Sequence, residues 1–224
     1  FRHYMLKEIY EQSDAVARTL DGRIADGRVL DASFGPLAND ALDKTSGIHI
    51  VACGTSYHAG LVARYWIESL CKLPCTVEIA SEYRYRSPVV PAGTLFVTIS
   101  QSGETADTLA ALRAAKEAGY VSTLTICNVP ESSMVRESDL TMMTHAGPAI
   151  GVASTKAFTT QLAALALLTI SLARRNGLEE RQERALVAQL SELPELISQV
   201  LALDSSIESL AEHFADKHHA LFLG

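Results

Sequence analysis

Basic residues are scarce in this sequence. Lysine and arginine total 19 against 26 aspartates and glutamates, so the formal net charge is −7. This composition argues against a nucleic-acid partner, because such proteins neutralise phosphates with a surplus of basic side chains. Small anionic ligands stay open, since backbone amides at helix starts and side-chain hydroxyls bind them without net positive charge.

Long apolar runs and cysteines are also few. The longest apolar stretch, Leu162 to Ala173, is interrupted by Thr169 and Ser171 and is shorter than the roughly 20 residues that cross a bilayer. We interpret it as a buried helix and expect no membrane partner. Four cysteines are too few to staple a chain of 224 residues, and no charged and apolar leader opens it. These features favour a reducing, cytoplasmic location.

Nucleotide and metal signatures are missing. Neither the P-loop pattern nor the Gly-x-Gly-x-x-Gly turn occurs, which argues against nucleoside triphosphates and nicotinamide cofactors. Cys71 and Cys75 lack the matching Cys or His pair that a zinc site needs. We therefore expect no cofactor and no metal.

Short apolar segments alternate with helical segments along the chain. Apolar runs and four-residue spacing predict strands at 48–52, 76–80, 95–99, 121–127 and 140–144 and helices at 57–70, 106–118 and 154–175. Strands that are apolar throughout, separated by helices, indicate an α/β protein whose parallel sheet is covered on both faces. Such sheets bind ligands at the carboxyl ends of their strands.

The flanks of this core are mainly helical in pattern, over 4–20 and 178–214. Pro194 is expected to break the second stretch.

The domain organisation follows from the two ends. The chain begins at Phe1, and residues 219–224 resemble 49–54 in being a short strand pattern that ends in glycine. We expect a piece of a longer polypeptide. Residues 1–177 would form a helical leader and a first domain, and residues 178–224 a helical segment and the start of a second, truncated domain.

Three strand-to-helix turns are rich in hydroxyl side chains. They are Cys53-Gly54-Thr55-Ser56, Ser100-Gln101-Ser102-Gly103-Glu104-Thr105 and Val152-Ala153-Ser154-Thr155-Lys156. A helix start leaves N–H groups unpaired and carries a partial positive charge, so hydroxyls there help to hold a phosphate. If the three turns converge at one sheet edge, they form a cage for one phosphorylated small molecule, such as a sugar phosphate.

Each turn alone has a simpler explanation, because Ser and Thr are the favoured N-caps of any helix. A cap needs one hydroxyl, however, and the second turn offers Ser100, Ser102 and Thr105 with a glycine between them. Taken together, the three turns favour the phosphate interpretation.

Three other residues in the turns can be explained without a catalytic role. Glu104 is interpreted as a capping carboxylate at the start of its own helix rather than a base. Lys156 either reaches an anion or lies on the surface. Cys53 has no base marked beside it, and its simplest role is that of a small buried thiol.

These motifs carry a resemblance. The three turns, with the opening His3-Tyr4-Met5-Leu6-Lys7-Glu8-Ile9-Tyr10-Glu11-Gln12, resemble the sugar isomerase (SIS) domain of the glutamine–fructose-6-phosphate aminotransferase family from end to end. One departure is Ser13, where the family usually has proline. The resemblance implies a three-layer, flavodoxin-like domain with a five-stranded parallel sheet and flanking helices, doubled in the full isomerase half. It also implies a homodimer and a glutaminase domain in the full-length chain.

The resemblance further implies the reaction and the residue roles. Ammonia from glutamine is added to fructose 6-phosphate, and the product is glucosamine 6-phosphate. Ser100, Gln101, Ser102 and Thr105 would bind the phosphate, Thr55 and Ser56 the sugar, and Val152 and Ser154 would close the pocket, with Cys53, Gly54 and Gly103 completing the turns. The family's catalytic glutamate, lysine and histidine lie beyond the position that matches Gly224. We therefore expect no catalytic residue in this chain, which would be inert alone.

Two other functions stay open. The same domain serves in regulators that sense a sugar phosphate without turning it over. Such regulators carry a basic DNA-binding helix, and the leader Lys7-Glu8-Ile9-Tyr10-Glu11 is not basic enough to suggest one. A stand-alone sugar-phosphate isomerase would need the catalytic glutamate and histidine within these residues.

Overall fold

The structure is a computed structural model that describes residues 1–151 and 153–221. Its helices are α1 (Tyr4–Tyr10), α2 (Gln12–Leu20), α3 (Ala38–Asp43), α4 (Gly54–Trp66), α5 (Ala80–Tyr83), α6 (Ala106–Lys116), α7 (Ser133–Glu137), α8 (Lys156–Arg175), α9 (Glu180–Leu201) and α10 (Asp204–Glu212). Its strands are β1 (Ile24–Ala25), β2 (Arg28–Val29), β3 (Gly47–Ala52), β4 (Cys75–Ile79), β5 (Thr94–Ser100), β6 (Ser122–Cys127) and β7 (Leu140–Met143). A 3-10 helix, η1 (Asp31–Phe34), and a π-helical turn, η2 (Ile67–Cys71), complete the elements.

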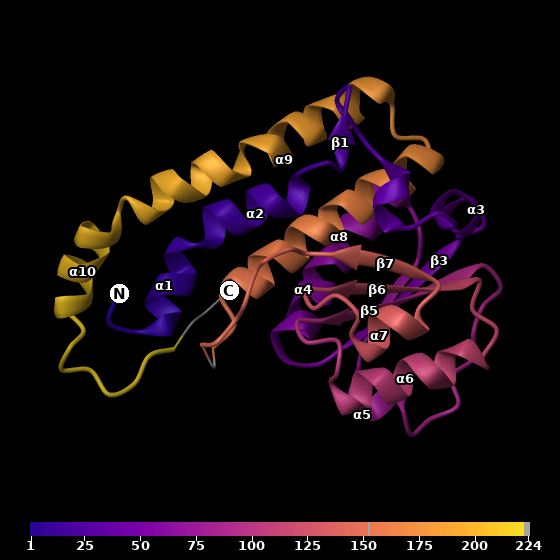
Figure 1. Cartoon of the computed structure of the whole chain (residues 1–224), viewed down its shortest axis with the longest axis horizontal. Coiled ribbons are helices and arrows are strands. Elements are labelled where there is room, and N and C mark those ends of the chain that lie inside the picture. The colour runs from indigo at the N-terminus through magenta and orange to yellow at the C-terminus, as the bar shows by residue number, and fades with distance from the viewer. Residues whose placement is uncertain (152, 222–224) are drawn as a thin grey trace.

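Strands β3 to β7 form one parallel sheet, in the order β4-β3-β5-β6-β7 (Figure 1). The three central strands are buried along their whole length. Their sequences therefore show no regular alternation of apolar and exposed polar residues, and the Thr and Ser residues of β5 and β6 are buried with the rest. The predicted α/β class with a five-stranded parallel sheet is confirmed.

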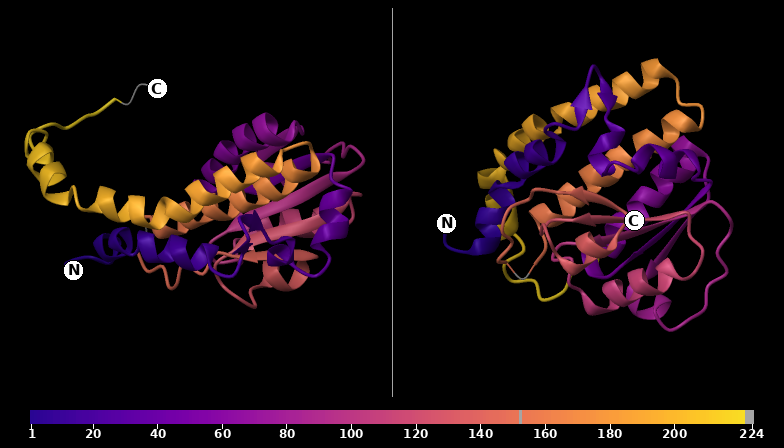
Figure 2. Two further views of the ribbon diagram at one scale, coloured as in Figure 1. Left: turned by 90° about the horizontal axis from the view of Figure 1, so that it is seen from above. Right: turned by 45° about the vertical axis from the view of Figure 1, so that its right-hand side comes forward.

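Helices cover both faces of the sheet, and the sheet separates two hydrophobic cores (Figure 2). Ile48 and Ile50 of β3 point into the larger core with α4, α8 and the leader helix α2. Val51, one residue further along the same strand, lies in the smaller core with α5 and α6. Alternate residues of one strand therefore anchor opposite layers.

Pro194 does not break the second helical flank, contrary to the prediction. Helix α9 runs through it without interruption, and the bend, of 46°, lies between α9 and α10. Leu190 is buried before the proline, and Leu193 and Ile197 pack against the core around it. This packing outweighs the roughly 3 kcal/mol that a proline costs inside a helix.

The predicted buried helix is α8. By length and composition α8 could span a membrane, and so could the bent pair of α9 and α10. Within the fold, however, 78% of the apolar window of α8 is buried, because α8 packs against α2, α4 and η2.

The predicted domain boundary at residue 177 falls in the turn between α8 and α9, where Gly177 has a φ of 93°. After this turn α9 returns along α2 (Figure 1). A second domain that begins in residues 178–224 stays a prediction, and the strand expected at 219–224 extends into residues 222–224, outside the described residues.

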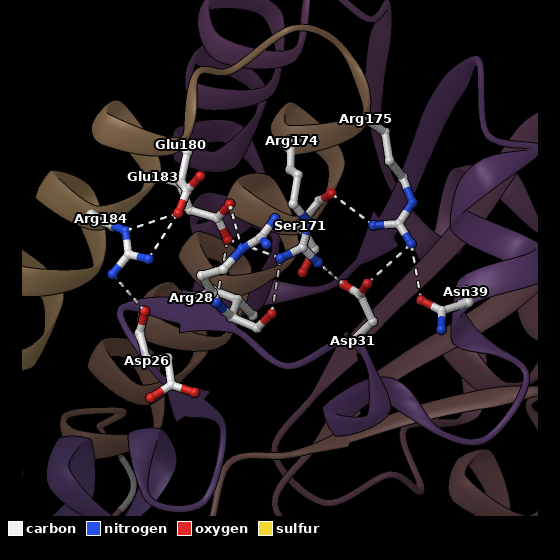
Figure 3. Close-up of polar contacts among 11 residues, drawn as sticks. Asp26, Arg28, Asp31, Asn39, Ser171, Arg174, Arg175, Glu180, Glu183 and Arg184 are labelled. Atoms are coloured by element: carbon white, nitrogen blue, oxygen red, sulfur yellow. Dashed lines mark hydrogen bonds and ion pairs between the residues drawn. The ribbon is translucent and has the colours of Figure 1, made fainter.

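A buried polar network fastens this turn to the β1–β2 hairpin (Figure 3). Arg174, at the end of α8, donates to Asp31 at 2.6 Å and to Glu183 of α9 at 2.9 Å. The Glu183 side chain is 1% exposed and also accepts the backbone N–H of Val29 at 3.4 Å. Because a buried charge needs partners, this network sets where the hairpin and α9 sit on α8.

We expect Glu183→Ala to lower the free energy of unfolding by about 1–3 kcal/mol, since it removes a buried acceptor of both Arg174 and the Val29 N–H and, among the described residues, leaves Arg174 paired with Asp31 alone of its charged partners. Glu180→Ala is the matched control on the same helix, because Glu180 pairs with Arg184 in the solvent. Its effect should stay below about 1 kcal/mol. Urea unfolding measures both, and equal losses would contradict a structural role for the network.

Candidate functional site

The first two hydroxyl-rich turns begin side by side. Strands β3 and β5 are parallel neighbours, with Ala52 paired to Ile99 in register. From β3 the chain crosses to β4 on one side, and it then returns to β5 on the other. The crevice outside such a reversal is where open parallel sheets bind ligands. The helices that follow the two turns, α4 and α6, therefore begin on either side of this crevice.

The first turn leaves its helix start open. Helix α4 begins at Gly54, whose φ of 57° favours glycine. Within the described residues Cys53, at the N-cap position, makes no side-chain capping bond. Its Sγ instead accepts the hydroxyl of Thr108, in α6, at 3.9 Å. Cys53 is half-buried and joins the two turns, while Thr55 is exposed and Ser56 is buried.

The second turn is shaped by its own hydroxyls. The buried Ser100 Oγ accepts the N–H of Gly103 at 3.0 Å and lies 3.4 Å from Thr105 Oγ1. Ser102 Oγ accepts the N–H of Glu104 at 3.2 Å. Thr105 occupies the N-cap position of α6, yet among the described residues its side chain makes no capping bond. A simple N-cap therefore does not account for these hydroxyls.

Gly103 is required by both its conformation and its surroundings. Its φ is 68°, and a Cβ at this position would lie 2.0 Å from Ser132 Oγ and 2.8 Å from Cys127 Sγ. The second turn thus fits closely over the segment that follows β6.

Glu104 has a structural role, but it is not the capping of its own helix that the sequence predicted. Its Oε1 accepts the N–H of Ser133 at 2.7 Å, so it caps α7 rather than its own helix α6. This hydrogen bond holds the pKa of Glu104 below its ordinary value. The carboxylate is therefore already engaged and is poorly placed to act as a base.

Asn128 joins the second turn to the loop that carries the third. Its backbone N–H donates to Gln101 O at 3.3 Å. Its side-chain Oδ1 accepts the N–H of Ala146 at 2.7 Å, and its Nδ2 donates to Gly147 O at 2.9 Å. The sequence analysis missed this residue, although an asparagine directly after a buried strand was a usable signal.

The third turn is held mainly by the leader helices. Lys156 is 3% exposed and pairs with Glu11, between α1 and α2, at 2.6 Å. The sequence analysis expected Lys156 either to bind an anion or to lie on the surface, and neither expectation holds. Ser154 is exposed. Val152, expected to close the pocket, lies outside the described residues.

A cavity of about 270 Å³ lies elsewhere, between η2, α8 and α9, lined by Trp66, Leu190 and Leu193 among others. Its walls are mainly apolar and do not match a sugar phosphate. The hydroxyl-rich edge is the better candidate, because its chemistry rather than its depth fits an anionic sugar.

The chain is a three-layer α/β domain in which two hydroxyl-rich helix starts lie at the switch point of the sheet, the place where the chain reverses direction between β3 and β5. These features define a class of protein. The sequence profile described as "SIS domain" matches residues 42–171, and the chain belongs to this family. The match spans β3 to β7 and the sequences of all three turns, and it ends within α8.

The similarity is high to one group of enzymes. The chain is 62% identical over 225 residues to a glutamine–fructose-6-phosphate aminotransferase (isomerizing) of Pseudomonas syringae and 58% identical over 224 residues to that of Escherichia coli K12. Both alignments cover all of this chain, which spans 37% of the length of each relative.

Solved structures of two related proteins have a similar fold. The C-terminal domain of glucosamine-fructose-6-phosphate aminotransferase from Francisella tularensis is 54% identical, with a TM-score of 0.96 over all of this chain and 63% of that one. A crystal structure titled putative phosphosugar isomerase, from Silicibacter pomeroyi, is 29% identical, with a TM-score of 0.72 over 88% of this chain and 56% of that one.

We expect Gly103→Ala to destabilise the protein more than Gly119→Ala. Both positions have positive φ, 68° and 86°, but a Cβ on Gly119 would meet nothing within 4 Å. Gly119→Ala should cost about 1 kcal/mol of strain, and Gly103→Ala a further ~1–3 kcal/mol from crowding. Chemical denaturation of the two variants measures the difference. Equal losses would mean that the second turn is not tightly packed on Ser132.

Proposed function

We propose that this chain is the sugar-phosphate-binding part of an enzyme that makes glucosamine 6-phosphate from fructose 6-phosphate and glutamine. The observation that carries the proposal is the pair of hydroxyl-rich turns at the starts of α4 and α6, side by side at the switch point of the sheet. The names of the similar aminotransferases support the same substrate.

The phosphate is assigned to the second turn, through Ser100, Gln101, Ser102 and Thr105. Ser102 Oγ accepts a backbone N–H, so its own O–H proton is available to donate to an anion. Ser100 Oγ likewise accepts a backbone N–H and pairs with Thr105 Oγ1, so these two hydroxyls together offer a donor. The start of α6 adds unpaired N–H groups and the positive end of the helix dipole. This local arrangement holds a phosphate even though the whole chain is acidic.

The sugar is assigned to the other two turns. Thr55 and Ser56, at the first turn of α4, would hold its hydroxyls, and Val152 and Ser154 would close the pocket from the third turn. Cys53, Gly54 and Gly103 complete the walls. Thr55 and Ser154 are exposed, so a ligand reaches them without rearrangement of the core.

Catalysis is assigned to residues outside this chain. Isomerisation between ketose and aldose needs a base within hydrogen-bonding reach of the migrating proton. Glu104, the carboxylate in the second turn, is occupied by the N–H of Ser133. We therefore propose that the chain binds the sugar phosphate without catalysing. From its similarity to the aminotransferases we also propose that it works in the cytoplasm with a glutaminase domain and a second copy.

A sensing module without catalysis is the second candidate. The engagement of Glu104 fits it equally well, because a sensor needs the phosphate-binding turns and no base. Activity of the full-length protein with fructose 6-phosphate and glutamine separates the two functions, since only the enzyme forms glucosamine 6-phosphate.

We expect Ser102→Ala to weaken fructose 6-phosphate binding by roughly 1.5–3 kcal/mol, the range for a hydrogen bond to a charged group. Isothermal titration calorimetry measures the change. Ser69→Ala is the matched control, because Ser69 is exposed in η2, after the far end of α4, and within the described residues its hydroxyl bonds Trp66 O alone. Unchanged affinity in the Ser102 variant would remove the second turn from the phosphate site.

We expect this chain, incubated with fructose 6-phosphate and ammonia, to form no glucosamine 6-phosphate. Product analysis by mass spectrometry tests this directly. Turnover that is lost again in Glu104→Gln would reassign Glu104 as a base, against its role as the cap of α7.

A further inference from the structure

A buried carboxylate on helix α1 was given no role in the function proposed above. Glu8 of α1 is 3% exposed. Its Oε1 accepts the backbone N–H groups of Ile150 at 2.6 Å and Gly151 at 2.9 Å, and its Oε2 accepts the hydroxyl of Thr155 at 3.4 Å. The leader thus grips the third turn, although the two lie more than 140 residues apart in the sequence (Figure 1).

The Glu8 carboxylate is built to stay ionised. Burial by itself would raise its pKa, but the two backbone hydrogen bonds and the nearby charge of Lys156 bring the pKa below its ordinary value. Lys156 is in turn paired with Glu11, one turn further along the leader. Hydrogen bonds to an ionised acceptor are stronger than those between neutral groups, so this grip is firm.

The fit between the leader and the loop is also close. A Cβ on Gly151 would lie 3.1 Å from Glu8 Oε2. A glycine at 151 therefore lets the loop backbone approach the carboxylate. Beside this contact a cavity of about 140 Å³ remains, lined by Tyr4, Lys7 and Pro148 among others.

The loop between β7 and α8 is therefore fixed at two places. Asn128 holds Ala146 and Gly147 at the sheet edge, and Glu8 holds residues 150, 151 and 155 at the leader. Ser154 lies between Gly151 and Thr155, both of which Glu8 binds. The position of the Ser154 backbone thus follows from the position of Glu8.

From this geometry we propose that Glu8 is a positioning residue for the sugar-phosphate pocket. It holds the third turn where Ser154 closes the pocket, and the docking of α1 therefore sets the affinity for the sugar phosphate. The proposal rests on the function proposed above. A movement of α1 would also change the position of the third turn, because the hydrogen bonds of Glu8 join the two.

The test is a double-mutant cycle with fructose 6-phosphate, measured by calorimetry on the 224-residue chain. Ser154→Ala and Glu8→Ala should each raise Kd by about tenfold, the equivalent of one hydrogen bond to the ligand. In the double variant the second substitution should add little, because both remove the same contact. Hydrogen exchange at the amides of residues 150 and 151 should speed up in Glu8→Ala.

Two further variants separate positioning from stability. Glu8→Gln keeps one carbonyl acceptor for the amides and should recover part of the lost affinity, and it replaces Glu8→Ala if that variant fails to fold. Glu183→Ala also loses a buried carboxylate, but one in the network of Figure 3. It should lower stability while leaving Kd unchanged.

The outcomes distinguish the two proposals. If Ser102→Ala and Ser154→Ala weaken binding while both Glu8 variants bind normally, Glu8 has no positioning role and the proposed function stands. Additive effects of Glu8→Ala and Ser154→Ala would likewise overturn the role, because Glu8 would then act elsewhere. If the unsubstituted chain does not bind fructose 6-phosphate, the proposed function itself falls.

Discussion

The reversal of chain direction between β3 and β5 is the constraint on which the rest depends. Because β4 lies on one side of β3 and β5 on the other, α4 and α6 cover opposite faces yet begin at the same point of the sheet edge. Two helix starts with unpaired N–H groups meet there. The acidic chain thereby acquires a locally positive place, and the hydroxyls of the two turns add hydrogen-bond donors to it, which is the basis of the phosphate site proposed above.

The third turn is of another kind. It follows the edge strand β7, away from the reversal, and no strand register brings it to the first two turns. Its loop is held by side chains from elsewhere, Asn128 at one end and Glu8 at the other. Under the proposed function, two walls of the pocket would depend on the sheet and the third on helix α1. Movement of α1 would then change the affinity for the ligand.

The sequence predicted most of the architecture, because each buried strand has an apolar run and each long helix has a four-residue apolar spacing of its own. The errors have a common origin. Pro194 was expected to end a helix, Glu104 to cap its own helix and Lys156 to face solvent or a ligand. In each case a partner distant in sequence decided the outcome: the packing around Leu190, the N–H of Ser133 and the carboxylate of Glu11.

The composition of the turns, the order of strands and helices and the family resemblance are legible in the amino-acid sequence, because they depend on neighbouring residues and on periodicity. The meeting of the first two turns at the reversal, the bridging role of Asn128 and the grip of Glu8 on residues 150 and 151 depended on the folded chain. Such contacts join residues far apart in the chain, and no local preference of either partner reveals them before both are packed.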